Sequence, residues 1–517
     1  MKRVPPNLIL VPLLLLRVFF SDANAQMHML TTPSLGAKAD ISQSQIPSNA
    51  VSQTVSRGTL LWLGTGKGAA RTSDGGRTFV SYRNVPQFPR PGIFALDVKG
   101  DTIWCSTGYV EQTQAAGSVQ TGTGYAYSFD NGGSWHSVPQ PIDGRFDTVV
   151  TYGANTIHFL PIVVPEQNVT FRLQVTDSAL WVASWSSGLR KSTDNGATWQ
   201  RTVLPADSLS SISPTDSLAG YLVDPRKNDN FLLFSVFVES PSIVWAGSAG
   251  GINRSPDGGV SWKKFTATNQ VDHILANWVI AIRGQRRGSA TRVWTANWPA
   301  TSASESYSVS FTDDSGKTWT NSLVGVKAYD FAFKDSLVYV ASDQGLFRSS
   351  NGGISWVMSG SIVDQGSGNV ITFSSFYAVA VVADTVYGGN ADGLVRTVDN
   401  ATHLFGSSWN VLRTSQPVGS SSTTYSYPNP FSPKREAVRF HYNLGQASAT
   451  VSIEVFDFGM NRVKTVLRDA PRSGQQERDE VWDGRDEQGS FVLNGVYFYR
   501  VTVNGGTPAW GKVMVIQ

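Results

Sequence analysis

The chain has 517 residues but only one cysteine, Cys105, and few charged residues. A single cysteine excludes an internal disulfide and any site built on paired cysteines. Charged residues make up 16% of the chain, which argues against helical bundles and coiled coils, because these need many Glu and Lys residues. The 42 basic and 39 acidic residues form no basic block, so we expect no nucleic-acid partner. The six histidines lack the spacing of metal ligands, and we expect neither a metal site nor a cofactor.

Glycine and apolar residues are abundant instead. The chain contains 49 glycines, and 41% of its residues are hydrophobic and 11% aromatic. This composition argues against a fully disordered chain and favours many short strands joined by tight turns. No stretch after the first 25 residues approaches 18 consecutive apolar residues, so we expect no transmembrane segment in the mature chain.

The first 25 residues have the three parts of a secretory signal peptide. Lys2 and Arg3 give a positive start, residues 8–16 form an apolar run, and Ala-Asn-Ala at 23–25 is a small-residue cleavage site. The run is far shorter than the ~20 residues of a membrane helix. A buried core strand is the alternative, but the polar segment 26–49 that follows fits it poorly. We therefore predict export to the periplasm and a mature protein that is secreted or held on the outer cell surface.

A short motif recurs through the middle of the chain: Ser or Thr, any residue, Asp, any residue, Gly, any residue, Ser or Thr, aromatic. Two clear copies are TSDGGRTF at 72–79 and STDNGATW at 192–199. The spacing between copies varies from 37 to 64 residues, which indicates a fixed unit with loops of different length. The residues at the acidic position are Asp74, Asp130, Asp194, Asp257, Asp314, Asn351 in a sixth copy and Asp399 in a degraded seventh.

The repeat motif is typical of a turn between two antiparallel strands. Its Asp side chain can accept hydrogen bonds from amides just downstream, and its Gly can take a positive φ. Alternating segments precede each motif, as at 178–199 and 336–356, and give four strands per unit. Because a small sheet buries its faces only against neighbouring sheets, seven such units over residues 50–412 predict a seven-bladed β-propeller.

The repeats resemble the Asp boxes, or BNR repeats, of the sialidase-like propeller superfamily, and the resemblance covers about 360 residues. It implies the fold more strongly than the function, because similar propellers occur in sialidases, xyloglucan hydrolases, sorting receptors and photosystem assembly factors. In that superfamily the Asp box is a structural turn that lies away from the ligand. The resemblance therefore implies a scaffolding role for these carboxylates rather than a catalytic one.

Successive antiparallel strands alternate in direction, so the motifs and the first-to-second turns of all blades share one face, the motif face. The longer insertions belong to the opposite face, the loop face: 107–124, 297–306, 139–168, 205–229 and 360–375. Long loops on one rim of a rigid scaffold commonly carry binding. The candidate binding residues there are Tyr109, Arg145, Tyr152, Trp185 and Trp298. The alternative is that the aromatic side chains only pack the loops down.

The sequence favours a binding protein for a glycan or protein ligand over an enzyme. Sialidases need clustered arginines, a Tyr–Glu pair and an Asp acid, and they carry an Arg-Ile-Pro segment that this chain lacks. The loop face offers only isolated acids, Glu111, Asp143 and Glu305, where a glycosidase needs a facing pair. Cys105 stands where sister blades carry Ala or Gly, as a small core residue. We assign no catalytic residue. The alternative function is a sialidase-type glycoside hydrolase. A third hypothesis is an assembly factor for an envelope or photosynthetic complex.

The last hundred residues follow a different pattern. Residues 413–427 are rich in Ser and Thr and predict a linker, and residues 428–517 have the strand cadence of an immunoglobulin-like sandwich. YPNPFSP at 427–433 and VWDGRDEQGSFVLNGVYFYRV at 481–501 resemble the C-terminal sorting domain of type IX secretion cargo, which is related to the immunoglobulin-like domain of the flagellar hook cap. The resemblance implies export across an outer membrane, with the secretion machinery as partner. A plain structural module is the alternative.

Overall fold

The computed structural model describes residues 40–42, 46–83, 85–88, 90, 92–113, 117–300, 302–366, 370–371, 373–414, 424–434, 436–473 and 477–517. The predicted signal peptide and most of the predicted polar segment and linker lie outside these residues. The chain forms two compact units. The larger contains residues 37–360 and 373–412, and the smaller is built mainly from residues 413–517.

The larger unit contains, in its described residues, seven antiparallel sheets whose four main strands pair in chain order. The first has β2 (Val51–Arg57), β3 (Leu60–Thr65), β4 (Gly68–Thr72) and β5 (Val80–Arg83); the second has β6 (Gly92–Lys99), β7 (Thr102–Thr113), β8 (Gly117–Ser128) and β9 (His136–Val138). The third has β12 (Thr170–Val175), β13 (Leu180–Ser184), β14 (Gly188–Ser192) and β15 (Gln200–Arg201); the fourth has β18 (Leu233–Val238), β19 (Val244–Ser248), β20 (Gly251–Ser255) and β21 (Trp262–Phe265). The fifth has β22 (Trp278–Arg287), β23 (Ala290–Trp298), β24 (Ser308–Thr312) and β25 (Thr320–Ser322). The sixth has β26 (Ala328–Lys334), β27 (Leu337–Ser342), β28 (Gly345–Ser349) and β29 (Val357–Met358); the seventh has β30 (Phe376–Val382), β31 (Thr385–Asn390), β32 (Leu394–Val398) and β33 (Asn410–Leu412).

Short elements extend this framework. β1 (Asp40–Ser42) pairs with β5, so part of the predicted polar segment is a strand, and β16 (Ser211–Ile212) pairs with β21. Between the second and third sheets the chain forms the hairpin β10 (Val149–Tyr152) and β11 (Asn155–Phe159), and β17 (Leu222–Val223) pairs with β11. A 3-10 helix, η2, covers Asp229–Phe231. No helix in the described part of the chain is long and apolar enough to span a membrane.

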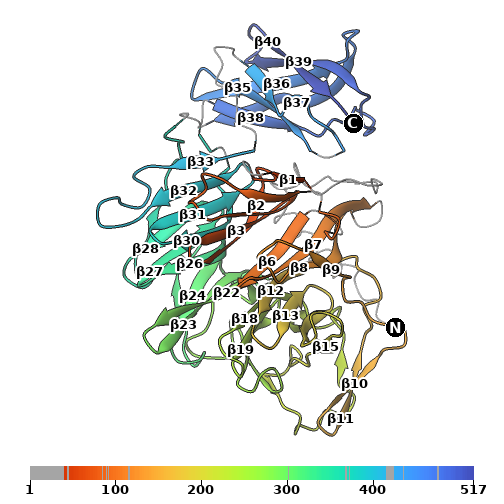
Figure 1. Cartoon of the computed structure of the whole chain (residues 1–517), viewed down its shortest axis with the longest axis vertical. Coiled ribbons are helices and arrows are strands. Elements are labelled where there is room, and N and C mark those ends of the chain that lie inside the picture. Colours follow the sequence, from red (N-terminus) through yellow and green to blue (C-terminus); the bar gives the residue numbers. More distant parts are fainter. Residues whose placement is uncertain are drawn as a thin grey trace. The chain divides into compact units, whose positions relative to one another are not determined.

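The first strands of the sheets contact one another in a closed cycle. β2 contacts β6, β6 contacts β12, β12 contacts β18, β18 contacts β22, β22 contacts β26, β26 contacts β30, and β30 returns to β2. These inner strands are labelled in Figure 1. Each sheet thus has a neighbour on both faces, and the predicted all-β propeller is confirmed.

The aromatic residue that closes each repeat motif packs against the preceding sheet. Trp135 of the second sheet lies edge-on to Trp62 and Tyr82 of the first, at 6.3 and 5.2 Å between ring centroids. Trp319 of the fifth sheet lies edge-on to Trp245 of the fourth at 6.2 Å. Aromatic side chains bury the most apolar area per residue, so these rings supply a large share of the adhesion between sheets.

The smaller unit is a two-layer β-sandwich in its described residues. One layer has the order β34 (Thr424–Tyr427), β35 (Val438–Asn443), β38 (Glu477–Trp482). The other has the order β37 (Arg462–Ser473), β36 (Ser448–Phe456), β39 (Gly495–Val503), β40 (Ala509–Val515). Both layers contribute to one core, in which Phe440 of β35 stacks on Tyr499 of β39 at 4.1 Å. Strand β34 begins inside the predicted linker, and the immunoglobulin-like relationship stays a prediction.

Replacing Trp319 with Ala should lower the free energy of unfolding of the propeller by about 3–5 kcal/mol, because it empties a buried contact between two sheets. The measurement is chemical denaturation of the mature chain, following the transition of the propeller. Ile354→Ala is the control: that side chain is 85% exposed in the sixth motif and should change stability by less than ~0.5 kcal/mol. Equal effects of the two substitutions would contradict the prediction.

Candidate functional site

The carboxylates of the repeat motifs are engaged within their own turns. Asp194 accepts hydrogen bonds from the Ser192 hydroxyl at 2.8 Å, from the Thr198 amide at 2.9 Å and from the Thr198 hydroxyl at 2.5 Å. Gly196 takes a φ of 81°, and its amide donates to Ser192. The same set of bonds recurs at Asp74, Asp130, Asp257 and Asp314.

These hydrogen bonds also fix the ionisation of the motif acids. Donors from Thr198 lower the pKa of Asp194 to about 2, and donors from Ser134 do the same for Asp130. Asn351 holds its turn through an amide: its Nδ2 donates to the Ser355 hydroxyl at 2.8 Å and its Oδ1 accepts from the Ser355 amide at 3.0 Å. Acids with such a low pKa cannot serve as proton donors near neutral pH.

The seventh motif is different, because Gly and Thr are missing from it. The Asp399 side chain is buried and accepts hydrogen bonds from the Tyr339 hydroxyl at 2.5 Å and from Arg348 Nε at 2.7 Å. Both partners belong to the sixth sheet. This carboxylate therefore links two sheets instead of closing its own turn.

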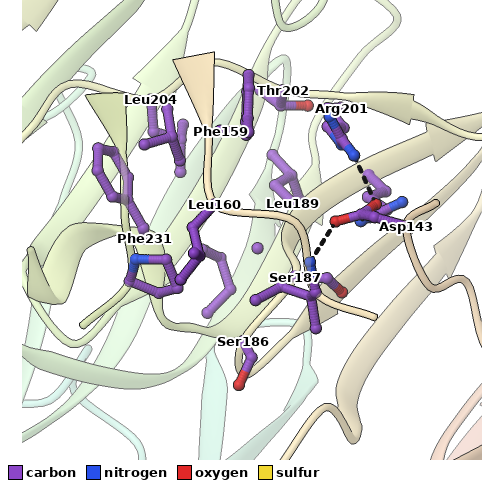
Figure 2. Close-up of a pocket in the computed structure, with 16 residues that line it drawn as sticks. Asp143, Phe159, Leu160, Ser186, Ser187, Leu189, Arg201, Thr202, Leu204 and Phe231 are labelled. Atoms are coloured by element: carbon purple, nitrogen blue, oxygen red, sulfur yellow. Dashed lines mark hydrogen bonds and ion pairs between the residues drawn. The ribbon is translucent and has the colours of Figure 1, made fainter. Parts of the chain in front are cut away.

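A pocket lies between the third and fourth sheets, beside the turn that joins β13 to β14. Its volume is small, about 30 Å³, which is enough for one or two water molecules. Figure 2 shows the apolar side chains of Phe159, Leu204 and Phe231 at one side and the polar pair Asp143 and Arg201 at the other. Most of its wall comes from the two long connections that the sequence places on the loop face, 139–168 and 205–229, and from β14.

The polar side of the pocket is a buried ion cluster. Asp143 Oδ1 lies 2.5 Å from Arg190 Nη2 and 2.7 Å from Arg201 Nη2, and Asp143 Oδ2 accepts the Ile162 amide at 2.7 Å. The three charged side chains are 3, 5 and 9% exposed. Arg201 also pairs at 3.0 Å with Asp147, whose side chain is 58% exposed.

Burial alone would raise the pKa of Asp143. The attraction of Arg190 and the hydrogen bond from Arg201 outweigh it and hold the pKa below its ordinary value. Asp143, predicted as an isolated acid of the loop face, is therefore a paired carboxylate. Asp143 is also the only acid among the described residues that line the pocket, so they hold no facing pair of carboxylates for glycoside hydrolysis.

Glu305 and Cys105 are not among the described residues that line this pocket. Glu305 accepts hydrogen bonds from Asn277 Nδ2 at 2.7 Å and from the Ala300 amide at 2.6 Å, and burial raises its pKa. The side chain of Glu111 lies outside the described part of the structure. Cys105 is fully buried in the second sheet, and burial raises the pKa of its thiol.

None of the five predicted binding residues is among the described residues that line the pocket. Arg145 is exposed, two residues after Asp143. Tyr109 lies on β7 with the guanidinium of Arg90 4.5 Å from its ring centroid. Its surroundings differ from the prediction, because part of the expected loop 107–124 instead forms the ends of the paired strands β7 and β8.

Tyr152 is buried beside a motif corner and does not lie on the loop face as predicted. Its hydroxyl donates to the carbonyl of Val260, in the fourth motif, at 2.6 Å. The cause is the hairpin β10–β11, which carries part of the 139–168 connection into a core shared with Trp181 and Trp262 of the third and fourth sheets.

Trp185 and Trp298 are 4 and 0% exposed and pack against the inner strands. In each of the seven described sheets the register between first and second strands shifts by one residue. The extra residues are Ser52, Phe94, Phe171, Phe234, Ile280, Tyr329 and Tyr377. Trp185 lies 5.0 Å from Phe234, and Trp298 lies 5.3 Å from Tyr329, between ring centroids. This geometry matches the packing alternative for both tryptophans.

The sequence contained a signal for Arg190 that the motif search missed. The third strands of the first, fourth and sixth sheets read GAART, GINRS and GLFRS, whereas β14 reads GLRKS. The middle residue is Ala70, Asn253 or Phe347 in those three strands and Arg190 in β14. A charged residue at a position that faces a neighbouring sheet requires a partner, and here the partner is Asp143.

No family model and no curated protein matches the chain. Solved β-propeller structures resemble it at low identity. YCF48 bound to D1 peptide has a TM-score of 0.41 and 15% identity, covering 72% of this chain and 99% of that one. PorZ, an essential surface component of the type IX secretion system of Porphyromonas gingivalis, has a TM-score of 0.36 and 13% identity, covering 90 and 66%. The GH74 enzyme of Niastella koreensis has a TM-score of 0.47 and 14% identity, covering 92 and 74%.

Asp143→Asn should destabilise the propeller by about 3–5 kcal/mol, because it leaves Arg190 buried without an anionic partner and leaves Arg201 with only the half-exposed Asp147. Denaturant titration of the mature chain measures the loss. Asp147→Asn is a matched control, since it removes a half-exposed carboxylate from the same Arg201 and should cost less than ~1 kcal/mol. The prediction is wrong if both substitutions cost the same.

Proposed function

We propose that this protein is an exported bacterial β-propeller that binds a glycan or a protein through its loop face. The observation that carries the proposal is the unequal use of the two faces. In the motif turns the polar side chains, such as Asp194 and Asn351, form hydrogen bonds within the turn. Few of their donors and acceptors therefore remain for a ligand. The long connections 139–168 and 205–229 instead contribute six of the described residues that line a small pocket with charged and apolar walls.

Binding rather than catalysis fits the chemistry of this pocket. Its acid, Asp143, is held ionised between two arginines and has no protonated partner acid across the cavity among the described lining residues. Two guanidinium groups and a wall of Leu and Phe side chains can orient and retain a ligand without transferring a proton. The sialidase-type hydrolase gains no support from this arrangement.

Screening the full mature chain on glycan and peptide arrays, followed by hydrogen–deuterium exchange with each hit, tests the binding role. Protection is expected in residues 139–162, 186–190 and 201–204, which line the pocket or lead into it. The turns of the motifs, for example 192–199 and 349–356, serve as the internal control and should exchange equally with and without ligand. Protection confined to the motif turns, or no hit on either array, contradicts the proposal.

We also propose that the C-terminal unit is the export address, in line with the residues at 427–433 and 481–501 that resemble a sorting domain. Because β34 begins at Thr424, the unit to remove is 424–517 rather than 428–517. A producing strain that carries this deletion should accumulate the propeller in the periplasm, measured by fractionation and surface proteolysis. Trp319→Ala, which weakens the propeller instead, controls for instability. Unchanged surface display of the deletion variant contradicts the sorting role.

A further inference from the structure

The outer face of the four-stranded sheet in the smaller unit carries apolar side chains, although a sandwich normally turns polar side chains to water. This sheet contains β36, β39 and β40, which are labelled in Figure 1. Along β39 and β40 alternate residues, such as Tyr499 and Val513, belong to the core of the unit. The residues between them lie on the outer face, where Trp510 is 46% and Met514 is 42% exposed.

Four aromatic rings on this side of the sheet form one connected surface. The ring centroids of Phe456 and Trp510 lie 5.5 Å apart, and those of Phe458 and Phe498 lie 6.2 Å apart. Phe498 is the cross-strand neighbour of Phe456, so the two pairs of rings are adjacent. Phe458 is 79% exposed. These four rings are the aromatic face, and a contiguous exposed patch of this kind marks an interaction site.

Cations lie beside the rings. In the pairing of β39 with β40, Lys512 is opposite Phe498 and Arg500 is opposite Trp510. The guanidinium carbon of Arg500 is 5.6 Å from the centroid of the Trp510 ring. The side chain of Lys512 is exposed and has no hydrogen-bond or ion-pair partner among the described residues. Its ammonium group can therefore meet an anion that a ligand supplies.

The charges beside the aromatic face favour an anionic ligand. Arg500 Nε donates to Glu454 at 3.2 Å, and Arg462 Nη1 lies 3.2 Å from the same carboxylate. Together with Lys512, these side chains carry three positive charges and one negative charge. A surface with an excess of one sign attracts groups of the opposite sign.

The mixture of rings and cations fits a glycan better than a protein. A protein packed tightly on the rings would remove Lys512 from water, which costs free energy unless a carboxylate meets it in the right place. Sugar rings have apolar C–H faces that can lie on aromatic side chains while their polar groups stay hydrated. An open sheet face also leaves room for a polymer that lies across it. An acidic polysaccharide meets all of these conditions.

We propose that the aromatic face binds an acidic polysaccharide, with sugar rings on Phe458, Phe498 and Trp510 and carboxylates beside Lys512. The site is on the smaller unit, so it goes beyond the proposed binding role of the propeller and does not depend on it. It is equally independent of the export role, because a chain can be exported whether or not this face binds a glycan.

Calorimetric titration of the full mature chain with hexasaccharides of alginate and of polygalacturonate tests the proposal. Each is compared with its carboxyl-reduced, neutral counterpart, and at least one acid should bind about ten-fold more tightly than its counterpart. Hydrogen–deuterium exchange should show protection at 452–456, 496–502 and 510–514. Equal binding of acid and neutral forms, or no binding of either acid, overturns the proposal. Protection confined to the propeller also overturns it, while supporting the loop face.

Substitutions assign the binding to the aromatic face. Trp510→Ser removes an exposed ring and Lys512→Gln removes the unpaired cation, and each should weaken binding of the acid about ten-fold. The matched controls are Phe129→Ser, a ring that is 47% exposed in the second motif, and Lys317→Gln, an exposed lysine in the fifth. Both should leave binding unchanged.

Lys512→Gln decides the outcome if Trp510→Ser does not fold, because the Lys512 side chain has no described partner whose loss could unfold the unit. Unchanged binding in the substituted chains overturns the proposal. Sedimentation of the ligand-free chain covers the other occupant of such a face. A dimer that Trp510→Ser dissociates would assign the face to a second copy of this chain and overturn the proposal as well.

Discussion

Closure of the ring is the constraint on which the larger unit depends. A four-stranded sheet with two apolar faces is stable only when another sheet covers each face, so the first and seventh sheets must meet. They do so through a shared core that joins Leu61 and Phe79 of the first sheet to Tyr387 and Leu394 of the seventh. The Arg396 side chain of the seventh sheet also donates to the carbonyl of Gly75 in the first motif. This contact joins parts of the chain that are 321 residues apart.

Polar bonds between adjacent inner strands support the same closure. Asp97 of β6 accepts the amide of Val175 on β12 at 2.9 Å, and Gln174 of β12 bonds both the amide and the carbonyl of Val238 on β18 at 2.7 and 3.1 Å. Inner strands cannot pair with one another as a continuous sheet because each belongs to a different blade. Side chains that reach from one strand to the backbone of the next satisfy these edge groups instead.

The sequence predicted the sheets and the motif turns because their causes are local. Alternation along a strand and an Asp three or four residues before its hydrogen-bond donors can be read within a window of ten residues, as at Asp194. The pocket could not be predicted in this way. Asp143 and Arg190 are 47 residues apart, and Tyr152 and Val260 are 108 apart. Nothing in the local pattern of 139–168 shows that this segment folds back as a hairpin between two sheets.

Trp185 and Trp298, predicted as exposed binding residues, are buried for a related reason. Trp185 directly follows β13 and Trp298 is the last residue of β23, at places where the sequence suggested exposed rims. The register shift gives each inner strand one extra residue, such as Phe234 in β18 or Tyr329 in β26. The ring of Phe234 packs against Trp185, and the ring of Tyr329 packs against Trp298. A β-bulge depends on pairing between strands, so its effect on neighbouring side chains is not visible in either strand alone.

The middle position of the third strand shows where function could enter such a repeated scaffold. It is apolar where sheets simply stack, as at Ala70 and Phe347, and polar at Arg190 and Asn253. Both polar residues bond to the inserted connections rather than to a neighbouring blade: Arg190 to Asp143, and Asn253 to Asn230 at 2.9 Å. The insertions therefore replace part of the contact between sheets. Asn253 and Asn230 exchange a donor and an acceptor, which completes their pairing. The Arg190 cluster differs from this pair, because Arg190 Nε is buried without a hydrogen-bond partner among the described residues.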